Sequence, residues 1–398
     1  MRALRFERSI PRFAAARLAD AVAPAHAAKV GPLRLAEVDP PELPGPGWRR
    51  VRPRLAGICG SDLATISAKS SRWFEPIVSF PFVPGHEVVG DLDDGTRVVV
   101  EPVLGCVARG IIPPCPACAG GDVGRCPNIA AGHLQPGLQI GYCGDTGGGW
   151  SGAFVAHESQ LHPVPDTMSD EGAMMVEPTA CAIRGAMRAA HGHESRGVAV
   201  VIGAGTLGLC TVAALSRWAF PDQLLVAAKH TEQRRLAAEL GATTVVEPAQ
   251  LRRAVRRATG SSALGTGDVD RLTTGADVVV DCVGTAASLD EALAITRPGG
   301  RIVLTGMPGR LTVDLTPLWQ REIELIGSYA YGVETHYPRR TFELAFQLVE
   351  ELDLGRLVSA TYPLGRWTDA LTHAGEAGRR GSVKVAFDLR DEPGRERP

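Results

Sequence analysis

The chain has 398 residues, of which 44% are hydrophobic and 22% are charged, and its formal net charge is −2. This length exceeds what one hydrophobic core usually serves, so we expect two globular domains. The near-neutral charge argues against a nucleic-acid surface, and no apolar run reaches the roughly 18 residues that suggest a membrane span. We expect a cytoplasmic protein, because the first residues lack the apolar core of a signal peptide and nine cysteines are better explained as thiols and metal ligands than as disulfides.

Residues 50–165 contain many short strand-like segments that Gly and Pro separate. A predicted strand over residues 3–6 precedes an Ala-rich insertion near residues 11–30, to which the sequence gives no function. Further strands are predicted over residues 50–55, 87–92, 96–100 and 153–156. This pattern is typical of an all-β, partly barrel-like domain.

The pattern changes after residue 170. A helix is predicted over residues 170–190, and strands over residues 197–202, 223–228, 276–281 and 300–305 then alternate with helices. This alternation predicts a parallel sheet with helices on both faces. Residues 383–388 are predicted to form a strand that rejoins the first domain. We therefore predict a first domain over residues 1–185, a dinucleotide-binding domain over residues 186–325, and a return to the first domain over residues 326–398.

Two short motifs carry metal-ligating residue types. G-I-C-G-S-D at residues 57–62 contains Cys59, and P-G-H-E at residues 84–87 contains His86 and Glu87. Thiolate, imidazole and carboxylate are the ligands of zinc, and a catalytic zinc site keeps one position open beside three protein ligands. The two motifs therefore predict a catalytic zinc site.

A second group of cysteines follows in a loop rich in Gly and Pro. Its members are Cys106, Cys115, Cys118 and Cys126, and the second and third form a C-x-x-C pair. Four thiolates in such a loop predict a closed, structural zinc site.

A glycine-rich pattern, G-x-G-x-x-G, lies between a predicted strand and a predicted helix. Gly203 makes the tight turn, Gly205 lets the backbone approach a pyrophosphate, and Gly208 allows close packing of helix on strand. The free N–H groups at the start of the helix, where Thr206 and Leu207 lie, would face the phosphates. This pattern predicts binding of NAD or NADP.

The end of the next strand bears on the choice between these cofactors. The carboxylate that binds the ribose of NAD is expected there, but the chain has Ala227-Ala228-Lys229-His230. Lys229 could pair with a 2′-phosphate, with His230 and Arg234 nearby. NADP is therefore favoured over NAD.

Together, these motifs resemble those of the zinc-dependent medium-chain dehydrogenases of the alcohol dehydrogenase superfamily, and most closely the polyol, threonine and glucose dehydrogenases. G-W-S-G-A-F at residues 149–154 and E-P-T-A at residues 177–180 also match. The resemblance implies an α/β protein with a GroES-like, partly open β-barrel catalytic domain and a Rossmann domain with a doubly wound parallel sheet. It also implies a homodimer or homotetramer through the dinucleotide domains, with edge strands near residues 300–309 pairing across a two-fold axis.

The resemblance assigns roles to single residues. Cys59 and His86 match the first two zinc ligands, and Glu177 matches the third position. Either Glu87 or Glu177 approaches the metal, and the other acts through water. Asp62 matches the carboxylate that fixes the tautomer of the ligand histidine, and Ser61 matches the hydroxyl that begins the proton path.

The implied reaction is zinc-dependent hydride transfer between NAD(P) and an alcohol, which could be a polyol, a sugar, an amino alcohol or a secondary alcohol. A zinc-independent enone or quinone reductase and a non-catalytic NADPH-binding module are the alternatives. Trp73, Phe74 and Trp150 are candidate walls of the substrate pocket. One departure from the family concerns the cysteine loop, because Cys106 and Cys115 are nine residues apart, farther than is usual. If Cys106 cannot reach the others, three thiolates remain.

Overall fold

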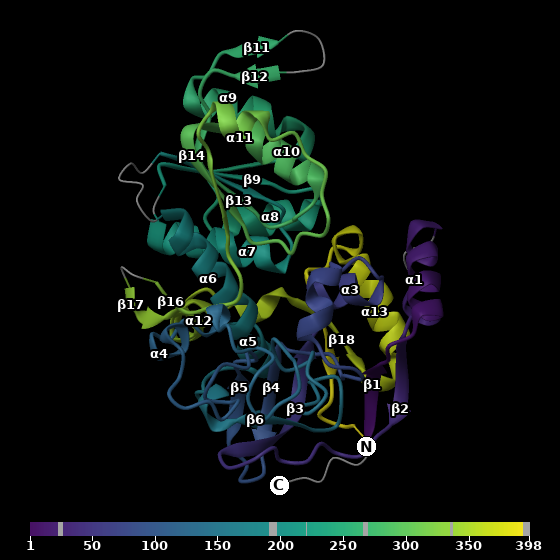
Figure 1. The fold of residues 1–398 in the computed structure, drawn as a ribbon. Helices are drawn as coiled ribbons and strands as arrows, with labels where there is room; N and C mark the ends of the chain where they lie inside the picture. Colours follow the sequence, from purple (N-terminus) through teal and green to yellow (C-terminus); the bar gives the residue numbers. More distant parts are fainter. Residues whose placement is uncertain (23–26, 191–196, 220, 266–269, 335–336, 393–398) are drawn as a thin grey trace. The chain divides into compact units, whose positions relative to one another are not determined.

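The computed structural model describes residues 1–398 except 23–26, 191–196, 220, 266–269, 335–336 and 393–398. Two compact units are present (Figure 1): Met1–Glu177 with Val349–Pro398, and Pro178–Leu348. The chain therefore passes from one unit to the other near residues 177 and 348, whereas the predicted domain limits are near residues 185 and 325.

The first unit is built on a mixed sheet in the order β18-β19-β3-β4-β5-β7, with β6 also paired to β3. The pair β18–β19 is parallel and the remaining pairs are antiparallel. The closing segment predicted as a strand is β19, which lies between β18 and β3. The strands of this sheet are β3 (Trp48–Gly57), β4 (Val88–Leu92), β5 (Arg97–Val100), β6 (Phe154–His157), β7 (Leu161–Pro163), β18 (Val358–Pro363) and β19 (Lys384–Asp388).

The Ala-rich insertion is helical. It forms α1 (Ile10–Val22) and α2 (Ala27–Val30) between β1 (Arg2–Phe6) and β2 (Leu33–Glu37), which pair antiparallel. Alanine has the highest helix propensity, which explains why this segment forms helices. Asp20 of α1 pairs with Lys69 at 2.6 Å, so a salt bridge fastens the insertion to the rest of the unit. The other helices of the unit are α3 (Gly60–Ile66), α4 (Pro116–Ala119), α5 (Asp170–Met174) and α13 (Trp367–Gly375).

The single helix predicted over residues 170–190 is two helices, α5 and α6 (Val176–Ala190). Pro178 explains the break. Its nitrogen cannot donate to the carbonyl of Met174, four residues earlier, and its ring would collide with that carbonyl. Pro178 is tolerated in the first turn of α6, where its missing N–H is not needed.

The second unit contains a six-stranded sheet in the order β10-β9-β8-β13-β14-β15, and all its pairs are parallel. This is the predicted doubly wound sheet. Its strands are β8 (Val198–Ile202), β9 (Gln223–Ala227), β10 (Thr244–Val246), β13 (Ala276–Asp281), β14 (Thr296–Leu304) and β15 (Glu324–Gly327).

Helices cover both faces of this sheet, with α9, α10 and α11 on one side and α6, α7 and α8 on the other (Figure 1). One core joins Val200, Leu225 and Val279 of the strands to Val255 of α9 and Leu289 of α10. The helices are α7 (Thr206–Ala214), α8 (Thr231–Glu239), α9 (Leu251–Thr259), α10 (Ala286–Ile295), α11 (Thr316–Gln320) and α12 (Thr341–Glu351). Two small antiparallel pairs complete the unit: β11 (Ala263–Gly265) with β12 (Asp270–Leu272), and β16 (Val333–Glu334) with β17 (Tyr337–Arg340).

The edges of this sheet correct one expectation. Residues 300–309 were predicted to supply an edge strand, but β14 lies between β13 and β15. Both of its hydrogen-bonding sides are therefore occupied within the chain. The edge strands are β10 and β15.

Candidate active site

Cys59 lies between β3 and α3, at the position that precedes the first turn of the helix. Its backbone N–H donates to Asp62 Oδ2 at 3.0 Å, which fixes the start of α3. Gly57, at the end of β3, has no space for a side chain, because a Cβ would overlap the carboxylate of Glu87. The first motif is thus packed directly against the second.

His86 is buried beside Asp62. Its Nδ1 lies 3.5 Å from Asp62 Oδ1, which is too long for a hydrogen bond, and this nitrogen makes none in the described part of the chain. Burial lowers the pKa of His86, but the negative charge of Asp62 and the thiol of Cys59 outweigh it and raise the pKa well above its ordinary value. The hydroxyl of Tyr142 donates to Asp62 Oδ1 at 3.3 Å. Asp62 is therefore placed to orient His86 through Nδ1, and a metal would bind the other ring nitrogen, Nε2.

Glu87 is held by a lysine that is distant in the sequence. Lys384 of β19 donates to Glu87 Oε2 and also to the carbonyl of Ile58 at 3.3 Å. Both side chains are buried, with 1% of Lys384 and 2% of Glu87 exposed. Burial lowers the pKa of Lys384, but Glu87, and then Cys59, outweigh it and raise the pKa. The carboxylate of Glu87 is therefore neutralised within the protein.

Glu177 and Ser61 complete the predicted set. Glu177 is buried at the start of α6, and its charge contributes to raising the pKa of Lys384. Ser61 is half-buried in the first turn of α3. Cys59, His86 and Glu177 do not form a group of ligand atoms as tight as that of the cysteine loop, which is the one such group of three or more found in the described chain.

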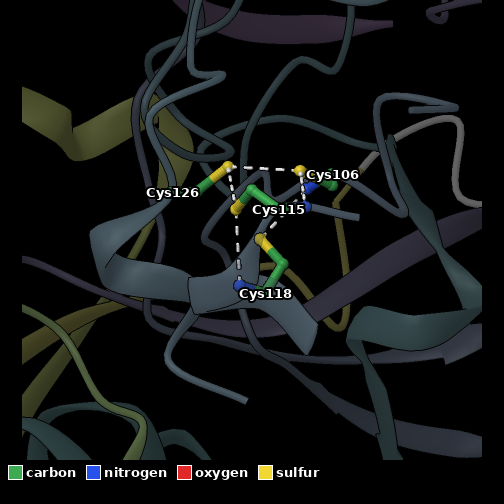
Figure 2. Close-up of side chains that lie close together, drawn as sticks. All are labelled: Cys106, Cys115, Cys118 and Cys126. Atoms are coloured by element: carbon green, nitrogen blue, oxygen red, sulfur yellow. Dashed lines mark hydrogen bonds between the residues drawn. The ribbon is translucent and has the colours of Figure 1, made fainter. Parts of the chain in front are cut away.

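The four cysteines of the loop face one another (Figure 2). Their sulfurs all lie within 4.8 Å of one another, with Cys106 Sγ 3.6 Å and Cys115 Sγ 3.9 Å from Cys126 Sγ. Four sulfurs bound to one zinc at about 2.3 Å lie about 3.8 Å apart in a regular tetrahedron. The longer spacing before Cys115 therefore does not prevent Cys106 from reaching the others.

N–H donors surround these sulfurs. Backbone N–H groups of Cys106, Cys115, Cys118 and Asn128 each donate to a cysteine sulfur at 3.4 Å, and Asn128 Nδ2 donates to Cys106 Sγ at 3.2 Å. Burial raises the pKa of Cys106, but the hydrogen bonds from Cys115 and Asn128 outweigh it and lower the pKa to about 7. For Cys118 and Cys126 burial prevails and raises the pKa of each thiol. The four sulfurs could therefore bind one zinc ion.

The glycine-rich loop lies between β8 and α7, as predicted. Gly203 has φ +93°, which favours glycine. A Cβ on Gly208 would overlap the carbonyl oxygen of Gly203, whereas a Cβ on Gly205 would meet no atom within 4 Å. Gly205 is thus the point at which the loop is open to a ligand, and Thr206 and Leu207 form the first turn of α7.

A second loop, which follows β13, lies beside the first. Asp281 Oδ1 accepts hydrogen bonds from the N–H groups of Val283 at 2.8 Å and Gly284 at 3.1 Å, and Oδ2 accepts one from Ser288 at 2.9 Å. A Cβ on Gly203 would contact the side chain of Val283, so the two loops touch. β8 and β13 are adjacent strands at which the strand order reverses, where α/β sheets bind their ligands.

The cationic residues predicted to select the cofactor lie together after β9. Lys229 is exposed, and His230 precedes the first turn of α8. Arg234 donates to the carbonyl of Lys229 at 3.0 Å and pairs with Glu247 at 3.3 Å. Arg234 is therefore partly neutralised, whereas Lys229 has no ion pair within the described residues.

The tryptophans that were predicted to line the substrate pocket lie in different surroundings. Trp150 is fully buried and donates to the carbonyl of Gly57 at 3.2 Å, so it belongs to the core and does not line a pocket. Trp73 is 82% exposed. The sequence motifs missed Lys384 and Tyr142. A lysine within the apolar stretch Val383–Leu389 was a usable signal, but nothing local marks Tyr142.

Comparisons with known proteins agree with this geometry. Residues 45–166 match the family model of the alcohol dehydrogenase GroES-like domain, and residues 206–351 match that of zinc-binding dehydrogenases. A sorbitol dehydrogenase of Arabidopsis thaliana is 28% identical over 91% of this chain and 92% of its own length. "Probable D-xylulose reductase A" of Neosartorya fischeri is 30% identical over 73% of this chain and 77% of its own.

A solved structure shows the same fold. An alcohol dehydrogenase from Thermus sp. ATN1 superposes with a TM-score of 0.69 at 24% identity, covering 98% of this chain and all of that one. Within the described residues, no helix is long and apolar enough to span a bilayer. The family models, the relatives and the two-unit fold lead to one conclusion: the chain belongs to the zinc-dependent medium-chain alcohol dehydrogenases, in the group that resembles polyol dehydrogenases, and it is an NAD(P)-dependent enzyme.

Proposed function

We propose that this dehydrogenase interconverts a small polyol or sugar alcohol and the matching carbonyl compound, with NADP favoured over NAD. The observation that carries the proposal is the half-buried Cys59 together with the buried Asp62 and His86, beside the ion pair of Glu87 with Lys384. The substrate class is supported by the relatives, which are described as a sorbitol dehydrogenase and a D-xylulose reductase.

The proposed ligands of the catalytic zinc are Cys59, His86 and Glu177. Glu87 is the other candidate carboxylate, but its charge is taken up by Lys384. One thiolate and one carboxylate neutralise a divalent ion, so a zinc held by Cys59, His86 and Glu177 needs no further charge. Glu177 is buried, as a ligand should be, and Glu87 remains the residue that acts from behind the site.

The roles of the side chains follow from their positions. When bound, zinc supplies a Lewis acid for the alcohol oxygen, and the nicotinamide accepts or returns the hydride. Asp62 orients His86 and is itself fixed by Tyr142 and the N–H of Cys59. Ser61, next to Asp62 in the first turn of α3, would receive the proton from the substrate oxygen.

We assign a second, structural zinc to the four cysteines of the loop, Cys106, Cys115, Cys118 and Cys126. The sulfur–sulfur separations near 3.8 Å and the N–H donors around the sulfurs support it. Its contribution would be to the stability of the loop, since a closed site with four protein ligands has no open position for a substrate.

The NADP preference rests on Lys229, with smaller contributions from His230 and Arg234. β9 ends without a carboxylate, and Lys229 is exposed and unpaired among the described residues, whereas Arg234 already pairs with Glu247. A charge-assisted hydrogen bond is worth roughly 1.5–3 kcal/mol. A net preference near 2.7 kcal/mol would correspond to about 100-fold in kcat/KM.

One experiment tests both parts of the proposal. Sorbitol, xylitol, a secondary alcohol and an amino alcohol would be oxidised with NADP and with NAD, with kcat/KM measured at the absorbance of the reduced nicotinamide. We expect a polyol with NADP to be best, Lys229→Ala to lose most of the NADP preference, and Arg253→Ala, an exposed cation on α9, to retain it. A higher kcat/KM for the plain secondary alcohol would contradict the substrate class, and equal use of NAD would contradict the role of Lys229.

Assembly and location are further parts of the proposal. The open side of β15 supports a homodimer or homotetramer that forms through the dinucleotide units. None of the nine cysteines, all of which lie in the described residues, forms a disulfide, which supports a cytoplasmic location, where disulfides are rare.

A further inference from the structure

Arg109 is a buried cation in the long segment between Cys106 and Cys115. Its side chain is fully buried, and no carboxylate of the described chain pairs with it. Its hydrogen bonds go to five backbone carbonyls: Leu104 at 3.1 Å, Ala131 at 3.0 Å, Leu134 at 3.4 Å, Gln135 at 3.3 Å and Gly137 at 2.5 Å. Buried charges are usually paired because desolvation is costly. Negative charge near Arg109 would therefore stabilise the buried guanidinium.

The backbone connects Arg109 to the first cysteine of the loop. The backbone N–H of Arg109 donates to the carbonyl of Cys106 at 3.1 Å, so the cation and the first thiol belong to one turn. Burial lowers the pKa of Arg109, while Cys143, Cys126, Asp145 and Cys106 act on it in the opposite direction. Two of the four proposed zinc ligands thus lie within electrostatic range of the guanidinium.

A zinc-loaded loop would carry an excess of negative charge that a nearby cation can balance. Four thiolates and one divalent ion leave two negative charges, and the N–H donors around the sulfurs are neutral dipoles. Arg125, the other arginine near these cysteines, is 60% exposed and pairs with Asp122 at 3.2 Å. Arg109 is fully buried, and no carboxylate of the described residues forms an ion pair with it.

We propose that Arg109 is the counter-charge of the four-cysteine zinc centre, and that it holds Cys106 within reach of the metal. The guanidinium binds the carbonyl of Leu104, just before Cys106, and the carbonyls of residues 131–137. This clamp compensates for the extra length of the segment before Cys115. The proposal rests on the structural zinc assigned above.

The experiment compares zinc retention in the full-length wild type, Arg109→Gln, Arg109→Lys and the control Arg125→Gln. Zinc per chain would be measured by elemental analysis, and its release by a colorimetric chelator. Replacing a group that supports metal ligands typically weakens affinity by about 10- to 100-fold. We expect Arg109→Gln to lose one zinc with that loss of affinity, Arg109→Lys to retain most of it, and Arg125→Gln to behave as wild type.

A second measurement separates the counter-charge from simple support of the loop. Arg109→Gln would be made in the wild type and in Cys118→Ser, which lacks a complete site, and thermal unfolding compared. We expect a larger loss of stability in the zinc-loaded background. Equal losses of stability in both backgrounds would overturn the role of Arg109 as counter-charge. So would an Arg109→Gln variant that retains zinc as well as a wild type with two zinc ions per chain. If the wild type holds one zinc per chain and Cys118→Ser holds the same amount, the four cysteines bind no zinc. That result would contradict both the structural zinc and the role proposed for Arg109.

Discussion

At the scale of single residues, Lys384 distinguishes two carboxylates that the sequence leaves equivalent. Glu87 directly follows the proposed ligand His86 in one motif, whereas Glu177 lies at the start of α6, far from the other proposed ligands in the sequence. Lys384 is 297 residues from Glu87, and only the pairing of β19 with β3 brings it to the site. A buried ammonium in contact with Glu87 makes that carboxylate a poor choice for a further positive partner.

Replacing the two carboxylates separately tests this assignment. Glu177→Gln should lower the zinc content by one per chain and abolish turnover, because the amide carries no charge to neutralise the metal. Glu87→Gln should keep its zinc. Elemental analysis of both purified variants measures the difference, and the opposite pattern would assign the ligand to Glu87.

Removing only one partner of the ion pair should destabilise the fold. Lys384→Met leaves Glu87 buried without a partner, and breaking a buried pair in this way typically costs about 3–5 kcal/mol. The double variant Lys384→Met with Glu87→Gln should recover much of that loss, because no charge remains buried. Urea denaturation measures both. An unchanged unfolding midpoint for Lys384→Met would mean that water or a shift of the chain solvates Glu87.

At the scale of elements, the loop between β8 and α7 contains two glycines with different reasons to be glycine. Gly208 is packed against the carbonyl of Gly203, whereas the space beside Gly205 is empty. Gly205→Ala should therefore leave thermal stability nearly unchanged, since its φ of −75° suits any residue, but should raise the dissociation constant of the cofactor. Gly208→Ala should lower stability. Thermal unfolding and fluorescence titration with NADPH test the pair, and normal cofactor binding by Gly205→Ala would place the phosphates elsewhere.

The elements that follow local rules were predictable. The strand, the glycine-rich turn and the helix around residue 203 are consecutive in the sequence, so their pattern was sufficient. The break before α6 could also have been found, because Pro178 lacks the N–H that a continuous helix needs. The edge strands of the sheet could not be predicted, because they depend on the spatial order of the strands. Nor could Tyr142 be connected with Asp62, which is 80 residues away.

At the scale of the whole molecule, β15 is the element that bears on assembly. It pairs with β14 on one side only, and Leu325 in its middle is 38% exposed. An open edge with an exposed apolar residue tends to pair with another chain. Two copies related by a two-fold axis would place their β15 strands antiparallel and join both six-stranded sheets.

A charge at this edge should prevent that assembly. Leu325→Lys would place two ammonium groups near each other across the two-fold axis, and lysine on an edge strand is a common means of blocking pairing. We expect wild type to sediment as a dimer or tetramer at micromolar concentration and Leu325→Lys as a smaller species with NADPH binding retained. Leu264→Lys, an equally drastic change at a 57% exposed leucine of β11, is the control and should assemble as wild type. A wild type that sediments as a monomer would contradict the homo-oligomer. Assembly that persists in Leu325→Lys would place the interface on another surface, since the edge of β15 could then no longer be the contact between subunits.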